Sequence, residues 1–312
     1  MAENKEKNFV SAVVYTHNVQ NEIQYFLSVL TCVLREHFEK FEIICVNDAS
    51  SDHTVEKIRE YAKNEKENVI SILNMSFYQG MELSMNAGVD LAIGDFVFEF
   101  DSAYLIYSEK IIFDVYQKCL MGYDIVAASP KNKKRFASQT FYKLYNKVAD
   151  TQYPLKTESF RVLSRRAINR VHSMSKTIPY RKAVYANCGL KTDAVYFDEV
   201  GETPRVSRET QKNQEEIAID SLILYSNVAY KCSIKLTQLM MIVTVAIGGY
   251  AAFIYIMRKP VAGWTTTMLF LAVSFLGIFA VLTIMIKYMS IILRISFNRQ
   301  KYVVESIDKL SN

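Results

Sequence analysis

Short apolar runs and segments with helical spacing alternate along the first part of the chain. The apolar runs are bounded by polar residues or glycine and predict buried β-strands. The segments between them place apolar residues at helical spacing and predict α-helices. The predicted strands span Phe9–Tyr15, Glu42–Val46, Val69–Asn74, Phe96–Phe100 and Asp124–Ala128, and the helices span Glu22–Arg35, Thr54–Asn64, Gly80–Ile93 and Glu109–Met121.

This repetition of strand and helix is typical of an α/β domain with a mostly parallel sheet flanked by helices. In such sheets, ligands bind beyond the carboxyl ends of the strands. Polar residues stand at several of these ends: Thr16 and Asn18 follow the first strand, Asn47 and Asp48 follow the second, and Asp101 follows Phe96–Phe100. We therefore expect the ligand-binding residues among them.

Two long stretches near the C-terminus carry no charged residue. They span residues 236–257 and 261–286. At about 1.5 Å per residue, a helix of either length can cross a hydrocarbon core of roughly 30 Å. We predict two transmembrane helices, at about 236–257 and 262–287, in preference to a pair of core helices, because neither stretch shows the polar face of a soluble helix.

Basic residues flank these stretches unevenly. Lys231 and Lys235 precede the first stretch, Lys287, Arg294, Arg299 and Lys301 follow the second, and the connection carries only Arg258 and Lys259. The positive-inside rule then predicts that both termini lie in the cytoplasm. An apolar signal-peptide region is also missing from the N-terminus. We therefore expect a multi-pass protein of the inner (plasma) membrane, with its first domain on the cytoplasmic side.

The stretch Glu215–Cys232 has a charged start and then apolar residues at helical spacing. This pattern favours an amphipathic helix at the membrane surface, with an ordinary core helix as the alternative. The predicted organisation is thus a globular domain over residues 1–210, a juxtamembrane helix over 211–235, two transmembrane helices within 236–294 and a cytoplasmic tail over 295–312.

Composition narrows the class of protein. Hydrophobic residues make up 50% and charged residues 22% of the 312 residues, which excludes a disordered chain. The net charge of +5 is too small to indicate nucleic-acid binding, but it suits a protein beside anionic phospholipid. The 5 cysteines form no C-x-x-C pair, which argues against disulfides and structural zinc and fits a reducing compartment.

Several catalytic motifs are missing from the sequence. No G-x-G-x-x-G follows the first predicted strand, and no G-x-x-x-x-G-K-[ST] occurs, so a dinucleotide enzyme and a P-loop ATPase lose support. There is no H-E-x-x-H and no G-x-S-x-G, and the 4 histidines are scattered. Hydrolysis by a zinc ion or a catalytic triad therefore has no visible apparatus.

Several segments together match one known family. Val46–Thr54 (VNDASSDHT) is similar to V-D-D-G-S-x-D-x-T, and Gly80–Asp95 (GMELSMNAGVDLAIGD) to G-x-x-x-A-x-N-x-G-x-x-x-A-x-G-D. Asp101 begins a D-x-D position, Ser159–Leu163 (SFRVL) stands where D-F-R-L-L is expected, and Gly263–Val304 matches by layout. On these motifs the chain resembles the family 2 glycosyltransferases with a GT-A fold. More narrowly, it resembles the membrane-anchored polyprenyl-phosphate sugar transferases.

The resemblance implies a GT-A, Rossmann-like domain that transfers a sugar, with inversion, from a nucleotide sugar (a UDP- or GDP-sugar) to a polyprenyl (undecaprenyl) phosphate at the cytoplasmic membrane face. It implies a catalytic role for Asp101 and Arg161. It implies a nucleotide-sugar site whose residues are Tyr15, Asn18, Asp48, Gly80 and Asp101. Similar transferases form oligomers, so a homo-oligomer, with a tetramer as one option, is also expected.

Positive charge is needed where the diphosphate leaves. The basic run that includes Lys131 and Arg135 could supply it, as could Arg161, and these three residues are the candidates for binding the diphosphate or the acceptor phosphate. The alternative for the run is a solvated basic loop near the bilayer. A general base is less necessary here, because the oxygen of a phosphate acceptor is already anionic near neutral pH.

The metal motif departs from the family pattern. The second acid of D-x-D is Ala103, so Asp101 is the one protein carboxylate left to hold the Mg²⁺ or Mn²⁺ that the resemblance implies. The metal could be held mainly by diphosphate and water, or be absent. We expect low turnover and expect Ala103→Asp to raise metal affinity.

These departures leave a second function open. Ala103 and Ser159 replace two acids of the family, and the basic segment expected before the membrane helices is reduced to Arg205 and Arg208. The alternative is therefore a catalytically impaired pseudo-glycosyltransferase that acts as a membrane-anchored binding or scaffolding subunit. A third option, a polysaccharide-building transferase, is disfavoured because the chain has no further spans and no Q-x-x-R-W-type motif.

Overall fold

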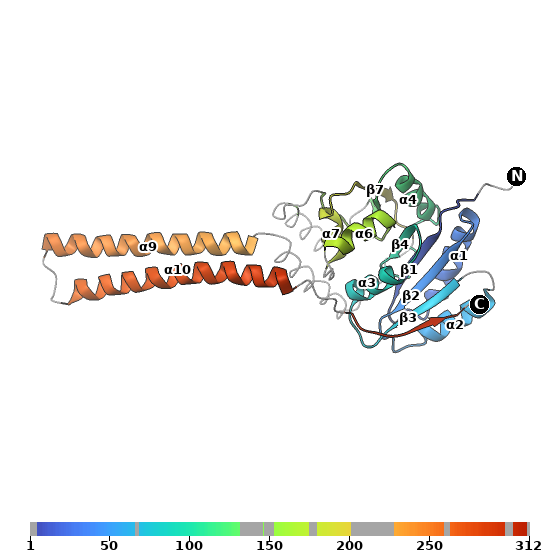
Figure 1. Cartoon of the computed structure of the whole chain (residues 1–312), viewed down its shortest axis with the longest axis horizontal. Helices are drawn as coiled ribbons and strands as arrows, with labels where there is room; N and C mark the ends of the chain where they lie inside the picture. Colours follow the sequence, from blue (N-terminus) through green and yellow to red (C-terminus); the bar gives the residue numbers. More distant parts are fainter. Residues whose placement is uncertain are drawn as a thin grey trace. The chain divides into compact units, whose positions relative to one another are not determined.

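The structure is a computed structural model that describes residues 5–65, 69–131, 146, 153–174, 180–200, 228–258, 263–296 and 302–310. The chain divides into two compact units, one formed by Met1–Ser221 with Arg299–Asn312 and the other by Leu222–Asn298. The first unit contains an α/β domain and the second contains two long helices (Figure 1).

A single mixed sheet lies at the centre of the first unit, in the strand order β7-β5-β6-β4-β1-β2-β3-β8. The pairs β1–β2, β1–β4, β2–β3 and β5–β7 are parallel, whereas β6 runs antiparallel between β4 and β5, and β8 runs antiparallel beside β3. The strands are β1 (Val10–Thr16), β2 (Phe41–Asn47), β3 (Val69–Met75), β4 (Phe96–Phe100), β5 (Ile125–Pro130), β6 (Phe160–Ser164), β7 (Thr192–Phe197) and β8 (Val304–Lys309).

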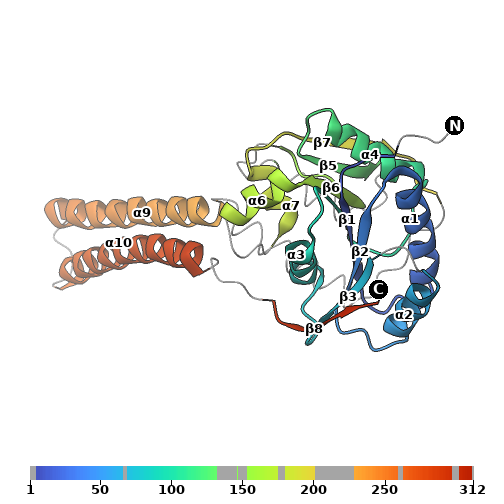
Figure 2. The same ribbon diagram turned by 45° about the vertical axis from the view of Figure 1, so that its right-hand side comes forward.

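Helices cover both faces of this sheet. Side chains at alternate strand positions, such as Val10 and Val14, join the apolar core beneath α1, α2 and α4. The opposite face carries α3, as Figure 2 shows for the central strands. The helices are α1 (Ile23–His37), α2 (Thr54–Asn64), α3 (Met81–Leu91), α4 (Lys110–Leu120), α6 (Arg165–Met174) and α7 (Arg181–Asn187).

Close packing of α3 on the sheet depends on Gly88. A Cβ atom at this position would lie 2.4 Å from a methyl group of Val13 and 2.6 Å from one of Val46. Any other residue would therefore force the helix away from β1 and β2. This packing fixes the start of α3 beside the carboxyl ends of the same two strands.

The C-terminal segment belongs to the α/β domain. Residues of β8 pair with β3 from Ser71↔Lys309 to Met75↔Val304, and the strand forms the edge of the sheet (Figure 2). The side chains of β8 alternate between partly buried and exposed. Residues 295–312 were expected to form a cytoplasmic tail, and this strand was not predicted from the sequence.

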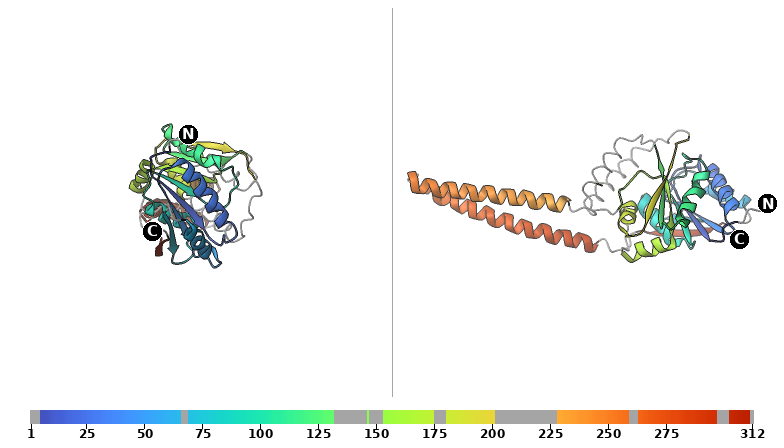
Figure 3. Two further views of the ribbon diagram at one scale, coloured as in Figure 1. Left: turned by 90° about the vertical axis from the view of Figure 1, so that its right-hand side faces the viewer. Right: turned by 90° about the horizontal axis from the view of Figure 1, so that it is seen from above.

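The second unit consists of α9 (Val228–Arg258) and α10 (Trp264–Ser296). Ile234–Met257 and Trp264–Met289 are long and apolar enough to cross a membrane, and only 11% and 0% of their most apolar windows are buried. The helices run side by side, in orange and red in Figure 3, and Gly248 of α9 faces Ala272 of α10, whose Cβ lies 3.5 Å from the ideal Cβ position of Gly248.

The predicted fold class is confirmed: a mostly parallel, Rossmann-like sheet domain precedes two apolar helices. Each strand and helix predicted up to Ala128 is present, with ends shifted by a few residues. Most of the predicted juxtamembrane helix over 211–235 lies outside the described residues, and α9 begins at Val228. Arg205 and Arg208 also lie outside them.

Candidate functional site

The polar residues predicted at the strand ends lie at one edge of the sheet. In the parallel register of β1 and β2, Thr16 stands opposite Asn47, and the backbone N–H of Asp48 donates to the Thr16 carbonyl at 3.0 Å. Asp101 follows β4, which pairs with the other side of β1. The topology thus brings the ends of three neighbouring strands together, as expected for this class of sheet.

Asp48 is the centre of the first cluster. Its Oδ1 accepts the backbone N–H of Gln79 at 2.8 Å, and its Oδ2 accepts the N–H of Gly80 at 2.8 Å and the hydroxyl of Tyr15 at 2.9 Å. The side chain is fully buried. Burial, and then the charge of Asp48, raise the pKa of the Tyr15 hydroxyl, which therefore stays protonated and donates to the carboxylate.

Gly80 and Asn18 hold the backbone in conformations that few residues adopt. Gly80 has a φ of 84° where the chain enters α3, and Asn18 has a φ of 53° just after β1. The Asn18 side-chain oxygen accepts the backbone N–H of Ser51 at 2.8 Å, and the Asn18 backbone N–H donates to the hydroxyl of Ser50 at 3.1 Å. These bonds tie the end of β1 to the loop after Asp48.

Asp101 lies in a second cluster, in which both of its carboxylate oxygens bind arginine. Its Oδ1 accepts Arg181 Nη2 at 2.7 Å and its Oδ2 accepts Arg161 Nη2 at 3.0 Å. Burial alone would raise the pKa of Asp101, but the two guanidinium groups hold it well below its usual range. Asp101 is therefore a permanent anion, and its side chain is only 12% exposed.

The two arginines are themselves shared among further carboxylates. Glu99 Oε2 accepts Arg161 Nη1 at 2.7 Å and Arg181 Nη1 at 2.9 Å, and the Tyr185 hydroxyl donates to Glu99 Oε1 at 2.6 Å. Glu99 and Arg161 face each other directly in the register of β4 and β6. Glu99 and Arg181 are fully buried, and Arg161 is 1% exposed.

Two more acids complete this arrangement, which we call the Asp101 network. Glu158 Oε2 accepts Arg161 Nε at 3.0 Å, and Glu82 Oε2 accepts Arg181 Nε at 3.0 Å. The network therefore consists of Asp101, Glu82, Glu99, Glu158, Arg161 and Arg181. It joins β4, β6, α3 and α7, so it fixes the geometry of this half of the sheet edge.

The residues around Asp101 do not fit a divalent cation. Such an ion needs several oxygen ligands, but both oxygens of Asp101 are engaged by arginine, and Ala103 is a buried apolar residue with no side-chain oxygen. Within the described part of the chain, no group of three or more His, Cys, Asp or Glu residues could hold a metal ion.

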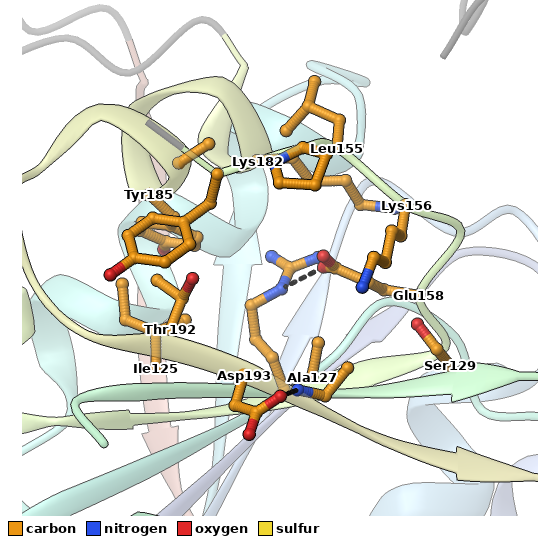
Figure 4. Close-up of a pocket in the computed structure, with 15 residues that line it drawn as sticks. Ile125, Ala127, Ser129, Leu155, Lys156, Glu158, Lys182, Tyr185, Thr192 and Asp193 are labelled. Carbon is orange, nitrogen blue, oxygen red and sulfur yellow. Dashed lines mark hydrogen bonds and ion pairs between the residues drawn. The ribbon is translucent and has the colours of Figure 1, made fainter. Parts of the chain in front are cut away.

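A cavity of about 230 Å³ adjoins the network (Figure 4). The strands β5 and β7 contribute Ala127 and Asp193 to its wall, and α7 contributes Tyr185. Basic and acidic side chains meet there, namely Lys156, Lys182, Arg161, Glu158 and Asp193. Arg161 thus lies between this cavity and Asp101.

The predicted basic run is only partly described. The Lys131 ammonium group forms an ion pair with Asp198 at 2.7 Å on the surface. Arg135 lies outside the described residues. The structure brings together Arg161 and Asp101, the two residues predicted to be catalytic. Lys131 does not belong to the Asp101 network.

The domain matches a known family over about half of the chain. The pattern described as "Glycosyl transferase family 2" covers residues 11–171 of the 312, from β1 into α6. The chain belongs to glycosyl transferase family 2. The resemblance to the family 2 glycosyltransferases is thereby confirmed.

Relatives of this glycosyltransferase are similar along most of their length. An uncharacterized glycosyltransferase of Synechocystis sp. is 27% identical over 86% of this chain and 85% of its own. The uncharacterized glycosyltransferase YkcC of Bacillus subtilis is 25% identical over 97% and 95%. A bactoprenol glucosyl transferase of Shigella phage SfV is 22% identical over 95% and 98%.

Solved structures confirm the GT-A fold. The mannosyltransferase PcManGT from Pyrobaculum calidifontis, solved with GDP-Man and Mn²⁺, covers 89% of this chain and 88% of its own with a TM-score of 0.50 at 14% identity. A glucosyl-3-phosphoglycerate synthase from Mycobacterium tuberculosis, solved with Mn²⁺, UDP-Glc and phosphoglyceric acid, covers 70% and 78% with a TM-score of 0.50 at 12% identity. At this identity the likeness establishes the fold and not the substrate.

Sequence reasoning missed most of the Asp101 network. Glu82, Glu99 and Arg181 were not singled out, nor was Tyr185. One signal was available: Glu99 interrupts the apolar strand FVFEF, and a carboxylate buried in a sheet needs a cationic partner. Arg181 gave no such signal, because its burial depends on the ion pairs that it forms with Glu82 of α3 and Glu99 of β4.

Proposed function

We propose that this glycosyltransferase moves a sugar from a UDP- or GDP-sugar to a polyprenyl phosphate at the cytoplasmic face of a membrane. One observation carries the proposal: a family 2 domain and two exposed apolar helices occur in one chain, and a bactoprenol glucosyl transferase matches that chain over 95% of its length. A lipid acceptor explains why a sugar-transferring domain would be attached to such helices.

The donor site lies around the Asp48 cluster. Tyr15 is partly exposed and Asn18 is exposed at the sheet edge. Gly80 has no side chain, so a ligand can approach its backbone closely. The nucleoside would bind here, and the sugar diphosphate would extend toward Asp101. Because Asp48 already accepts three hydrogen bonds from within the domain, its first role is to hold Tyr15 and Gly80 in place. Direct contact between Asp48 and the nucleotide stays a prediction.

The acceptor phosphate would approach from the side of the cavity in Figure 4. Arg161 and Lys182 line that cavity, so an anionic group entering it meets positive charge near Asp101. The phosphate oxygen attacks the anomeric carbon as the bond to the diphosphate breaks, and a single displacement inverts that carbon. Lys131 and Arg135 remain candidates for neutralising the departing diphosphate.

The pairing of Asp101 with two arginines favours a second function. With Ala103 in place of an acid and both Asp101 oxygens bound to arginine, the site lacks the apparatus that would fix a cation against the diphosphate. The second candidate is a catalytically impaired subunit that binds a nucleotide sugar at the membrane without transferring the sugar.

Two measurements separate these functions. Calorimetry with UDP and with GDP tests binding by the detergent-solubilised chain, and incubation with labelled UDP- and GDP-sugars and undecaprenyl phosphate tests transfer. Binding with a lipid-linked product supports the transferase, and binding without product supports the impaired subunit. If the chain binds neither UDP nor GDP, both proposed functions are contradicted.

The membrane arrangement is part of the same proposal. In this proposal α9 and α10 cross the inner membrane as a hairpin, and the bias of basic residues predicts that both termini lie in the cytoplasm. Protease treatment of intact cells should then leave tags at both ends uncut, and cleavage of either tag from outside contradicts this orientation.

A further inference from the structure

The C-terminal segment reaches the candidate donor site through its first described residues. Beyond the strand pairs of β3 and β8, the backbone of Val303 continues the contact: its carbonyl accepts the N–H of Ser76 at 3.2 Å. At the next position the chain leaves β3 for the loop that leads to Gln79 and Gly80. The C-terminal segment, residues 302–310, therefore lies at Val303 beside the loop whose backbone binds Asp48.

The Gln79 side chain replaces a strand partner for Val303. Its Nε2 donates to the Val303 carbonyl at 2.7 Å, and its Oε1 accepts the Val303 N–H at 2.9 Å. One amide thus satisfies both backbone groups of one residue, as a neighbouring strand would. The two bonds fix the side chain of Gln79 to the C-terminal segment.

The backbone of the same residue binds Asp48. The N–H of Gln79 donates to Asp48 Oδ1 at 2.8 Å, and the adjacent Gly80 N–H donates to Oδ2 at 2.8 Å. Asp48 also holds the Tyr15 hydroxyl. Gln79 is therefore a single residue that joins the C-terminal segment, through its side chain, to the Asp48 cluster, through its backbone.

A second route runs parallel to the first. Asn74 of β3 donates from Nδ2 to the Ser306 hydroxyl of β8 at 3.0 Å, and its Oδ1 accepts Asn47 Nδ2 at 2.9 Å. Asn47 precedes Asp48 and accepts the Ser50 N–H at 3.1 Å. Both routes lead from the C-terminal segment to the loop after β2.

We propose that Gln79 is a positioning residue that couples the C-terminal strand to donor binding, so that the segment following the second apolar helix sets the affinity for the nucleoside diphosphate. The inference rests on the proposed function, because it takes the Asp48 cluster as the donor site. By linkage, the coupling is reciprocal: a seated tail favours nucleotide binding, and a bound nucleotide holds the tail on β3.

The test uses the full-length chain in detergent, with UDP and GDP as probes. Gln79→Ala removes both bonds to Val303 and leaves the backbone bond to Asp48 possible. Loss of these partly exposed bonds should weaken nucleotide affinity by about five- to tenfold, on the scale of one net hydrogen bond. The matched control is Arg59→Ala, which removes the Arg59–Asp308 ion pair at the far end of β8 and should leave affinity within about twofold.

Hydrogen exchange distinguishes this coupling from a merely structural role of Gln79, because a structural role alone would not make exchange in residues 303–309 depend on bound nucleotide. Saturating nucleotide should slow exchange of the backbone amides of residues 303–309 in the wild type and in Arg59→Ala, but not in Gln79→Ala. If Gln79→Ala does not fold, Gln79→Glu serves instead, because it keeps the acceptor for the Val303 N–H and loses the donor to the Val303 carbonyl.

The outcomes distinguish this inference from the proposed function. Wild type that binds neither UDP nor GDP contradicts both. Wild type that binds nucleotide while the tail amides exchange at the same rate contradicts the coupling alone. Unchanged affinity in Gln79→Ala, or an equal loss in Arg59→Ala, also overturns it.

Discussion

Replacing Arg181 with methionine tests the Asp101 network most sharply. The side chain is fully buried and forms charge-assisted hydrogen bonds to Glu82, Glu99 and Asp101. Methionine is also long and fits a buried site, but it leaves these carboxylates without that guanidinium group. The substitution therefore removes charge with little loss of packing.

The expected magnitude follows from which acids lose their partner. Breaking a buried ion pair by removing one partner costs about 3–5 kcal/mol. Glu99 and Asp101 keep Arg161, and Glu82 keeps the Arg181 backbone N–H at 2.9 Å, so we expect the lower end, about 3 kcal/mol. Urea unfolding of the detergent-solubilised chain, followed by circular dichroism, measures this free energy.

The pH dependence of the unfolding free energy gives a second, independent test of the Asp101 network. The arginines hold the pKa of Asp101 below its unfolded value, so its contribution to stability is present above about pH 4 and is lost as the pH falls. In Arg181→Met the pKa of Asp101 moves back toward the unfolded value. The difference in unfolding free energy between wild type and variant should therefore shrink as the pH is lowered from about 5 to 3.

Two variants control for non-specific damage. Arg181→Met combined with Glu82→Gln should cost less than the sum of the two changes, because the uncompensated carboxylate is gone. Arg59→Met removes an arginine whose ion pair with Asp308 is partly exposed on both sides, at 47% and 31%, and should change stability little. An Arg181→Met variant as stable as Arg59→Met, or a difference from wild type that does not vary with pH, would refute the reasoning.

Other predictions concern metal, assembly and backbone geometry. Ala103→Asp was expected from the sequence to raise metal affinity, but with Asp101 bound to two arginines the single change should add no Mn²⁺ binding by calorimetry, and micromolar binding would contradict this. Gly248 faces α10, whereas the ideal Cβ position of Gly249 has no atom within 4 Å beyond its chain neighbours and its own helix backbone. If α9 also mediates oligomers, Gly249→Leu should lower the mass of the detergent-solubilised protein, and Gly248→Leu should disturb the hairpin first. Equal masses in all variants would count against that interface. Asn18→Gly should be tolerated and Asn18→Val should cost about 1–2 kcal/mol in unfolding, because only the latter is strained at a φ of 53°.

The first half of the fold could be predicted because its signals are local. Apolar strands such as FVSAVVY and helices of regular spacing alternate there, and parallel pairing of neighbours follows from that order. The antiparallel insertion of β6 between β4 and β5 has no local signal. Neither does β8, whose short, charged sequence VESIDK becomes a strand only against the edge of β3.

The candidate site shows the same division. Asp48 and Asp101 were found because a strand end and a family motif coincide at each of them, and Gly80 was found because it begins a family motif. Arg161 was a candidate too, because it stands in the family motif SFRVL. Its pairing with Glu99 and the second arginine, Arg181, join segments that lie far apart in sequence. These charges compensate each other only after the sheet has formed, so composition and spacing could not reveal the pairing.

The most direct test of the account is sugar transfer with and without metal. The full-length chain would be incubated with labelled UDP- or GDP-sugars and undecaprenyl phosphate, in EDTA and in Mn²⁺, beside the bactoprenol glucosyl transferase of Shigella phage SfV. We predict a lipid-linked product from this chain that forms about 10²–10³-fold more slowly than that of the relative and at the same rate in EDTA as in Mn²⁺. No lipid-linked product from any donor, or product in Mn²⁺ alone, would contradict the account.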